Sequence, residues 1–283
     1  MNYFKSVEET FSNQTFNTKI STDNQRFKAH YNSLNSCLLL ESVSEKARII
    51  DLGCGKGTEL LKYQMHNPSA VVLVDISCEC LMKAQEFAKD KNISYDIFDI
   101  QLNIATDELF NHRLTLPKEK IGRTISTRDF DVATSFSVLE FLPSIEHLHH
   151  TATQVYKTLA RGGFWIGCLI DTNILFERLD TNNEYKDTYC SIQRKHGEYF
   201  MTVNDKTTCQ NLCISPDVLE QTAAQVGFQI VKSTNWATYM GGISFTPEVQ
   251  KLTRVMQLND RNKLKVSDLR ALSLMHVFKF QKP

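Results

Sequence analysis

The sequence predicts an α/β fold, with a seven-stranded, mostly parallel sheet and helices on both faces. Two observations predict it. From Arg48 onward, short apolar runs alternate with segments of helical periodicity, which is the pattern of parallel strands joined by helical crossovers. The second half closes with a strand, helix, strand and hairpin order that adds a sixth and a seventh strand to the same sheet.

The first five strands follow one another in chain order. They are expected at Arg48–Leu52, Val71–Asp75, Ser94–Phe98, Phe130–Phe136 and Gly163–Leu169. Between them, helices are expected at Thr58–Gln64, Cys80–Asp90 and Ser144–Leu159. The last is the clearest, because its apolar residues recur on one helical face and Gly162 follows as a stop.

The second half carries one strong helix signal. Ser215 is placed to cap a helix whose first position is Pro216, where no backbone donor is needed, and Gly227 ends it. Strands are expected at Phe228–Val231 and Leu274–Phe280, the latter from its alternation of apolar and polar residues.

Domain organisation is simple. Residues 1–25 form a polar arm or linker, and residues 26–283 form a single domain without repeats. Residues 101–128 form a long insert between the third and fourth strands, and inserts of that length are often functional. Its basic residues, among them Arg113 and Arg128, suit either a solvated connector or RNA contact.

Charge and cysteine usage narrow the function classes. Lys and Arg number 32 and Asp and Glu number 32, so no global field attracts long nucleic acid or an anionic membrane. Neither a membrane span nor a signal peptide is predicted. Eight cysteines without paired C-x-x-C spacing indicate reduced thiols, a cytoplasmic location and no metal site.

A glycine-rich turn follows the first strand. Gly53, Gly55 and Gly57 allow the backbone to approach a ligand, and Asp75 ends the next strand about 20 residues later, placed for a ribose diol. This pattern predicts an adenosine-containing cofactor. Because the glycines run G-x-G-x-G, it favours S-adenosylmethionine over NAD. Phe98 and Asp99, at the third strand's end, are expected to contact the adenine.

The segment Asp51–Tyr63 reads D-L-G-C-G-K-G-T-E-L-L-K-Y and resembles the D-L-G-C-G-K-G-G-D-L-L-K-[WY] stretch of mRNA cap guanine-N7 methyltransferases. Fainter similarity extends over residues 27–282. The resemblance implies a Rossmann-like class I methyltransferase fold, S-adenosylmethionine as cofactor and the capped 5′ end of mRNA as partner. The polar arm is similar to that of the methyltransferase domain of a multifunctional capping enzyme from a large cytoplasmic DNA virus. This implies host cytoplasm and possible guanylyltransferase and triphosphatase partner modules.

The resemblance also implies residue roles. The cofactor would be bound by Asn35, Asp51, Gly53, Gly55, Asp75, Ile76, Phe98, Asp99, Ser135 and Phe136, the last two in a loop after the fourth strand. The substrate would be bound by Lys56, Glu59, Lys62, Glu140, Phe141 and Asn211.

Several of these positions depart from the family. Asn35 stands in place of a lysine, Glu140-Phe141 in place of a His-Tyr pair, Asn211 near a family glutamate and Met275 in place of a tyrosine. The residues expected to bind the methyl donor match the family pattern, whereas those expected to bind the methyl acceptor are altered.

No catalytic residue is expected, because guanine N7 has a free lone pair and needs only proximity and orientation to the methyl group. No credible Ser-His-Asp arrangement is expected either. Glu140 is the hypothetical acceptor for the guanine N1–H and amine, with Phe141 stacking on the purine. Two alternatives stay open: a methyltransferase acting on another RNA or a small molecule, and a catalytically silent binding module.

Overall fold

The computed structural model describes most of the chain. The described residues are 22–110, 112–115, 124–186, 190–195, 198–203, 206–210, 214–242 and 266–283. The predicted arm, 1–25, lies outside them except at its end, where helix α2 (Thr22–Leu40) begins. Helical structure therefore starts a few residues earlier than the predicted domain boundary.

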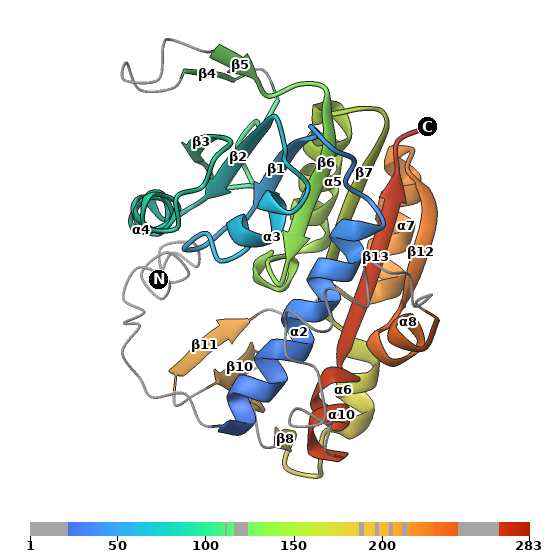
Figure 1. The fold of residues 1–283 in the computed structure, drawn as a ribbon. Helices are drawn as coiled ribbons and strands as arrows, with labels where there is room; N and C mark the ends of the chain where they lie inside the picture. The colour runs from blue at the N-terminus through green and yellow to red at the C-terminus, as the bar shows by residue number, and fades with distance from the viewer. Residues whose placement is uncertain are drawn as a thin grey trace.

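One seven-stranded sheet forms the centre of the molecule, in the order β12-β13-β7-β6-β1-β2-β3 (Figure 1). Its strands are β1 (Arg48–Leu52), β2 (Ala70–Asp75), β3 (Asp96–Gln101), β6 (Phe130–Phe136), β7 (Leu159–Ile170), β12 (Gln229–Asn235) and β13 (Met275–Gln281). Only β13 runs antiparallel to its neighbours, β7 and β12; the other pairs are parallel. The predicted mostly parallel, seven-stranded sheet is confirmed.

The strand predictions differ in accuracy. Those at Arg48–Leu52 and Phe130–Phe136 match β1 and β6 residue for residue. The third strand was expected to end at Phe98 but continues to Gln101, because β3 stays paired with β2 up to Asp75 opposite Gln101. This shift changes which residues reach the edge of the sheet.

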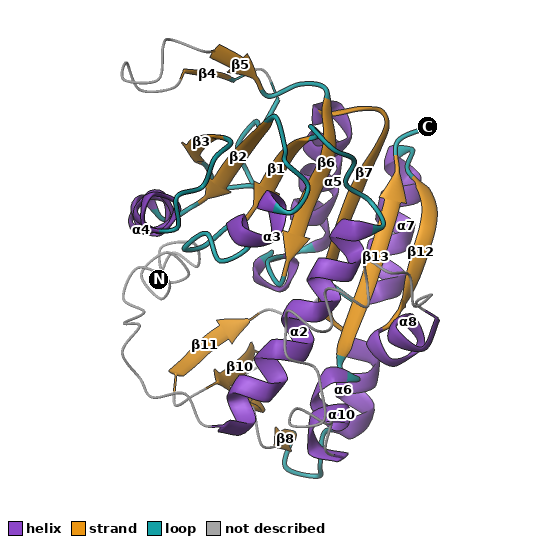
Figure 2. Cartoon of the chain, in the orientation of Figure 1, coloured by secondary structure: helices purple, strands orange, loops and turns teal. Residues whose placement is uncertain are grey.

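Helices cover both faces of the sheet (Figure 2). Their bounds are α3 (Leu60–Gln64), α4 (Cys78–Asp90), α5 (Ile145–Thr158), α6 (Thr172–Arg178), α7 (Pro216–Val226), α8 (Trp236–Gly242) and α10 (Val266–Leu272). One face packs against α2, α3 and α4 and the other against α5 and α7, which gives two hydrophobic cores. None of the described helices is both long and apolar enough to cross a membrane.

Helix α7 forms as its sequence signals predict. The Ser215 hydroxyl accepts a hydrogen bond from the Val218 N–H at 3.3 Å, and Pro216 occupies the first turn. Gly227 ends the helix in the left-handed conformation, with φ of 111°. The buried side chains of Leu219 and Ala223 then face the sheet through the second core.

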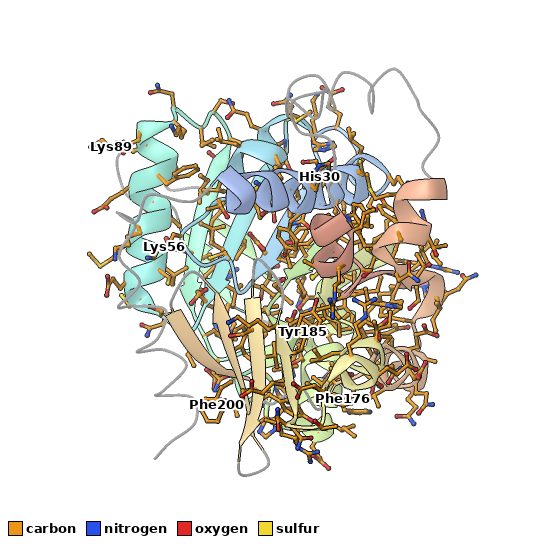
Figure 3. The ribbon with its side chains drawn as sticks, turned by 90° about the horizontal axis from the view of Figure 1, so that it is seen from below. His30, Lys56, Lys89, Phe176, Tyr185 and Phe200 are labelled. Carbon is orange, nitrogen blue, oxygen red and sulfur yellow. The ribbon has the colours of Figure 1, made fainter. Side chains whose placement is uncertain are left out.

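A second, four-stranded antiparallel sheet lies between α6 and α7 in the chain, and it was not predicted. Its strands are β8 (Glu184–Lys186), β9 (Cys190–Lys195), β10 (Glu198–Val203) and β11 (Lys206–Gln210), in the order β11-β10-β9-β8. Tyr185, Ile192 and Tyr199 are buried in the same core as α2. Figure 1 shows this sheet beyond the carboxyl ends of the parallel strands, and Figure 3 labels Tyr185 and Phe200 on it.

The predicted insert, residues 101–128, ends in a hairpin of β4 (Arg113–Thr115) and β5 (Thr124–Ser126). The hairpin lies at the amino edge of the main sheet, because Arg48, the first residue of β1, donates to the Ser126 carbonyl oxygen at 2.9 Å. The hairpin therefore lies at the edge of the sheet opposite to the carboxyl ends of the parallel strands (Figure 1).

Close packing between β6 and β7 predicts a sensitive position. A Cβ at Gly167 would lie 2.1 Å from the Ser135 carbonyl oxygen, a backbone atom held by strand pairing. We expect Gly167→Ala to lower the free energy of unfolding by about 2–4 kcal/mol in urea titrations. Gly241→Ala, whose Cβ meets nothing within 4 Å, is the matched control; equal effects of the two substitutions would contradict the packing argument.

Candidate functional site

A cavity opens at the carboxyl edge of the parallel strands, where ligands bind in open α/β sheets. It is lined by Gly53, Gly55, Asp75, Ile76, Leu102, Asn103, Ile104, Ser137, Val138, Phe141 and Leu142. We call it the rim cavity. Its lining comes from the loops after β1, β2, β3 and β6, so four strand ends converge on one site.

The loop after β1 carries three glycines, at positions 53, 55 and 57, all with positive φ. Gly53 has φ of 68°, and a Cβ there would lie 2.2 Å from Cγ2 of Val138. Gly55 has φ of 52°, and a Cβ there would meet nothing within 4 Å. The first glycine thus permits contact with the loop after β6, and the second leaves open space beside the rim cavity.

Asp75 fixes the loop after β1 to the end of β2. Its Oδ2 accepts a hydrogen bond from the Gly55 N–H at 2.8 Å, and its Oδ1 accepts one from the Ser77 N–H at 2.9 Å. The Ser77 hydroxyl in turn accepts from the Cys80 N–H at 3.2 Å and caps α4. The structure thus brings together Gly53, Gly55, Asp75 and Ile76, four of the residues predicted to bind the cofactor.

Phe98 and Asp99, predicted to contact adenine, do not line the rim cavity. Phe98 is buried in the second core, and Asp99 is exposed and accepts a hydrogen bond from the Gln85 side chain at 2.8 Å. Because β3 continues to Gln101, Leu102–Ile104 occupy the position expected for these two residues. Leu102–Ile104, which were not predicted to line the site, lie at the start of the predicted insert, residues 101–128.

Ser135 and Phe136 were expected in a loop after the fourth strand, but both belong to β6. Ser135 is fully buried and accepts a hydrogen bond from the Trp165 indole N–H at 2.9 Å. Ser137 and Val138 line the rim cavity in their place. Ser137 adopts φ of 53°, an uncommon conformation for a residue with a side chain.

Helix α2 places polar side chains over the sheet face next to the loop after β6. The Tyr31 hydroxyl lies 2.7 Å from Ser137 Oγ and 3.3 Å from Cys168 Sγ. Asn35 is fully buried; its Oδ1 accepts from the Cys168 thiol at 3.7 Å, and its Nδ2 has no partner among the described residues. Burial raises the pKa of Tyr31 well above its usual value, so the hydroxyl stays neutral.

Asp51, at the end of β1, is buried. Its Oδ1 accepts from the Thr134 hydroxyl at 2.9 Å, and the Tyr63 hydroxyl also interacts with this carboxylate. Burial raises the pKa of Asp51 to about 7, and the nearby carboxylate of Glu59 adds to the rise.

Two predicted substrate-binding residues pair with each other. Glu59 is 9% exposed and forms an ion pair with Lys62, whose ammonium also donates to the Asn32 side-chain oxygen at 3.2 Å. Lys56 lies half-buried in the loop after β1 and is labelled in Figure 3. Glu59 and Lys62 thus follow directly after the loop that carries Lys56, and Lys62 is paired with Glu59 and Asn32.

Glu140 and Phe141 take positions that differ from the guanine-binding hypothesis. Both belong to a short 3-10 helix, η2 (Leu139–Phe141). Glu140 is buried; its Oε1 accepts from the Ile170 N–H at 3.1 Å, and no group in the described part of the chain pairs with its Oε2. Phe141 lines the rim cavity alongside Asp75 and Ile76. Asn211 lies outside the described residues, and Met275 is buried in β13.

The structure also assembles a serine, a histidine and an aspartate that the sequence did not suggest. Ser233 Oγ lies 2.8 Å from His276 Nε2, and His276 Nδ1 lies 3.5 Å from Asp171 Oδ2. Asp171 also caps α6 by accepting from the Ile174 N–H at 3.2 Å. None of the three lines the rim cavity, so they do not belong to this site. Their contacts link β12, β13 and the start of α6.

The buried Glu140 predicts pH-dependent stability. Burial raises its pKa to about 7, above the unfolded value, so the stability it contributes is full at low pH and is lost as pH rises through about 7. We expect Glu140→Gln, which keeps an acceptor for the Ile170 N–H, to raise the free energy of unfolding at pH 8 by about 1–3 kcal/mol.

Urea titrations at pH 8 and pH 4.5 measure this effect. At the lower pH the difference from the wild type is expected to fall below about 0.5 kcal/mol. Glu86→Gln, at an exposed position of α4, is the matched control. A stabilisation of equal size at both pH values would contradict the assignment to Glu140 ionisation.

Comparison with known proteins places this site in a family. The family model described as a methyltransferase domain matches residues 25–233. The mRNA cap guanine-N(7) methyltransferase of Eremothecium gossypii is 24% identical over 178 residues, which is 62% of this chain and 40% of that protein. The Saccharomyces cerevisiae protein of the same name is 23% identical over 186 residues, 61% of this chain and 41% of that protein. The chain thus spans about two fifths of these relatives.

Solved structures share the fold. The PH0226 protein of Pyrococcus horikoshii superposes with a TM-score of 0.60 at 14% identity, covering 97% of this chain and 99% of that one. The CcbJ methyltransferase of Streptomyces caelestis gives a TM-score of 0.54 at 14% identity, covering 99% and 97%. With a class I fold and a methyltransferase-domain match over most of its length, the chain belongs to the S-adenosylmethionine-dependent methyltransferases.

Proposed function

We propose that this methyltransferase transfers the methyl group of S-adenosylmethionine to N7 of the guanine in a 5′ mRNA cap. The observation that carries the proposal is the similarity to fungal proteins named as cap guanine-N(7) methyltransferases. The cap-family stretch at Asp51–Tyr63, which includes the loop lining the rim cavity, supports it.

The residues around the rim cavity fit S-adenosylmethionine. Gly55 leaves open space where any side chain would project, and Asp75 lines the same cavity with a carboxylate suited to a ribose diol. Ile76 and Leu102 supply apolar walls for a base.

For this reaction the protein mainly has to position the two reactants. When bound, S-adenosylmethionine supplies a methyl group on a positively charged sulfur. Guanine N7 carries a lone pair and no proton, so no general base is needed, and the neutral Tyr31 hydroxyl beside Ser137 suits such a site. The chain has to hold the acceptor in line with the methyl group and keep water away.

The acceptor contacts in this proposal do not include Glu140 or Phe141. The burial of Glu140 and the place of Phe141 in the rim cavity favour roles in supporting the loop and in contacting the donor. Acceptor contacts are then left to α2, the Glu59–Lys62 pair and Lys56.

The different roles of Glu140 and Phe141 favour a second candidate function, methyl transfer to a small-molecule acceptor. A catalytically silent module is a further possible outcome of the test. Capping-enzyme partner modules, a viral origin and a cytoplasmic location stay predictions.

One assay separates these functions. We expect the protein and labelled S-adenosylmethionine to methylate GpppA-capped RNA, with N7-methylated cap released by nuclease digestion and identified by mass spectrometry. Free GTP and a panel of amines are run in parallel. Label transferred only to amines would replace the cap proposal with the small-molecule alternative. Donor binding without transfer to any acceptor would indicate a silent module.

Donor affinity tests the placement of the cofactor. We expect Asp75→Ala to weaken S-adenosylmethionine binding at least about tenfold in calorimetry. The substitution removes the carboxylate that would accept charge-assisted hydrogen bonds from the two ribose hydroxyls. Asp99→Ala should change it by less than about twofold, because this exposed carboxylate pairs with Gln85 outside the rim cavity. Equal losses in both variants would instead support a contact between Asp99 and the adenine.

A further inference from the structure

An exposed aromatic ring lies where α6 meets the second sheet. Phe176 of α6 is 42% exposed, and its ring stacks on that of Tyr199 of β10, with centroids 5.2 Å apart and ring planes 22° from parallel. The Arg194 guanidinium of β9 lies 5.6 Å from the centroid of the Tyr199 ring. The chain thus holds an exposed ring on an aromatic support that also contacts a cation.

Two further arginines lie beside the same sheet. The Arg270 guanidinium of α10 lies 5.6 Å from the centroid of the Tyr185 ring of β8. Arg178 of α6 donates to the Arg270 carbonyl oxygen at 2.8 Å and to the Ser273 hydroxyl at 3.0 Å. These hydrogen bonds join α6 to α10 and hold the two arginines together.

Strand pairing makes the two tyrosine–arginine contacts neighbours. Tyr185 lies opposite Ile192, and Arg194 lies opposite Tyr199, on adjacent strands of the second sheet. Because Ile192 and Arg194 are two residues apart on β9, they and the residues opposite them share one face of the sheet. Figure 3 labels Phe176 and Tyr185 on α6 and β8. We call the following residues the aromatic–arginine patch: Phe176, Tyr185, Tyr199, Arg178, Arg194 and Arg270.

The arginines of the patch have no carboxylate partner within the described part of the chain. The ion pairs found there involve three lysines and one histidine. Of the acidic residues adjacent in sequence, Asp180 accepts backbone N–H groups, Glu184 accepts from the Gln193 side chain, and Glu177 is exposed. An exposed ring among arginines that no described carboxylate neutralises fits an anionic ligand with an aromatic face, and a nucleotide is such a ligand.

The patch lies at the same edge of the main sheet as the rim cavity. Ile170 ends β7 at the carboxyl edge, and its N–H donates to Glu140, the neighbour of Phe141 in the cavity wall. From Ile170 to Phe176 the chain covers two extended residues and about one helical turn, a path of about 13 Å. A few nucleotides of single strand are long enough to span that separation.

We propose that the aromatic–arginine patch binds the single-stranded RNA that follows the cap, with one base stacked on Phe176 and phosphates near Arg194 and Arg270. The identity of the RNA rests on the proposed function, and the patch adds a contact outside the rim cavity. Because the chain has no net charge, its grip on RNA has to come from local groups. Stacking accepts any base and arginine–phosphate contacts carry no sequence information, so binding is expected to be independent of sequence.

Fluorescence anisotropy with the full chain and a labelled, capped RNA octamer tests the stacking contact without methyl transfer. Phe176→Ala should weaken binding at least about fivefold, with its melting temperature recorded to check folding. Phe176→Tyr keeps the ring and should stay within about twofold of the wild type. Val231→Ala, at a side chain that is 47% exposed on β12, is the matched surface control and should also leave the affinity unchanged.

Salt titrations test the arginines. Arg194→Gln and Arg270→Gln should each lower the slope of log affinity against log salt concentration by about 0.7, the value for one phosphate contact on a single strand. Competition with unlabelled GpppA dinucleotide separates the patch from the cap contact. If the octamer binds and responds to Phe176→Ala while GpppA does not bind, the cap proposal fails and the patch proposal holds.

Three results would overturn the patch proposal while leaving the cap proposal intact. One is a capped octamer that binds no more tightly than GpppA, and another is an octamer affinity that Phe176→Ala leaves unchanged. The third is a change of molar mass in light scattering on Phe176→Ala with RNA affinity unaltered, which would assign the patch to contact between two copies of this chain.

Discussion

The hydrogen bond from the Gly55 N–H to the Asp75 carboxylate, 2.8 Å long, is the contact on which the site depends. It joins the loop after β1 to the end of β2, two segments that are 20 residues apart in the chain. Parallel pairing of the two strands brings both ends to the same edge of the sheet, where this bond joins them. The close approach of Gly53 to Val138 extends this arrangement to the loop after β6.

The parts of the site that are local in sequence could be predicted. Gly53, Gly55 and Asp75 follow from an apolar strand, a run of glycines and a second strand at fixed spacing. Each of these features is determined by nearby residues, because positive φ values favour glycine and because a strand's last residue reaches the sheet edge. The same locality explains why α7 was predicted with its caps at Ser215 and Gly227.

Strand ends, in contrast, depend on pairing with a neighbour. β3 continues past Phe98 because β2 offers partners as far as Asp75, and nothing within the segment itself reveals this. With this longer strand, Phe98 lies in the second core and Asp99 on the surface, and Leu102 lines the rim cavity. The second sheet escaped prediction for a related reason: its short strands pair only with one another and carry many polar residues.

Burial of polar groups was equally hard to foresee. Glu140 lies in a segment whose sequence suits a surface helix start, yet its carboxylate is inside and bonded to the end of β7. The resemblance predicted that Asn35 binds the cofactor, but its burial follows from the packing of α2 against Cys168. Such residues become recognisable once tertiary contacts are known.

The position of Cys78 gives this chain a built-in attachment point for a spectroscopic label. Of the five cysteines whose side chains the structure describes, Cys37, Cys54, Cys80 and Cys168 are buried, and Cys78 alone is exposed. It is the first residue of α4, two positions after Ile76 in the cavity wall. A thiol-reactive fluorophore placed there would sense ligand occupancy from just outside the binding surface.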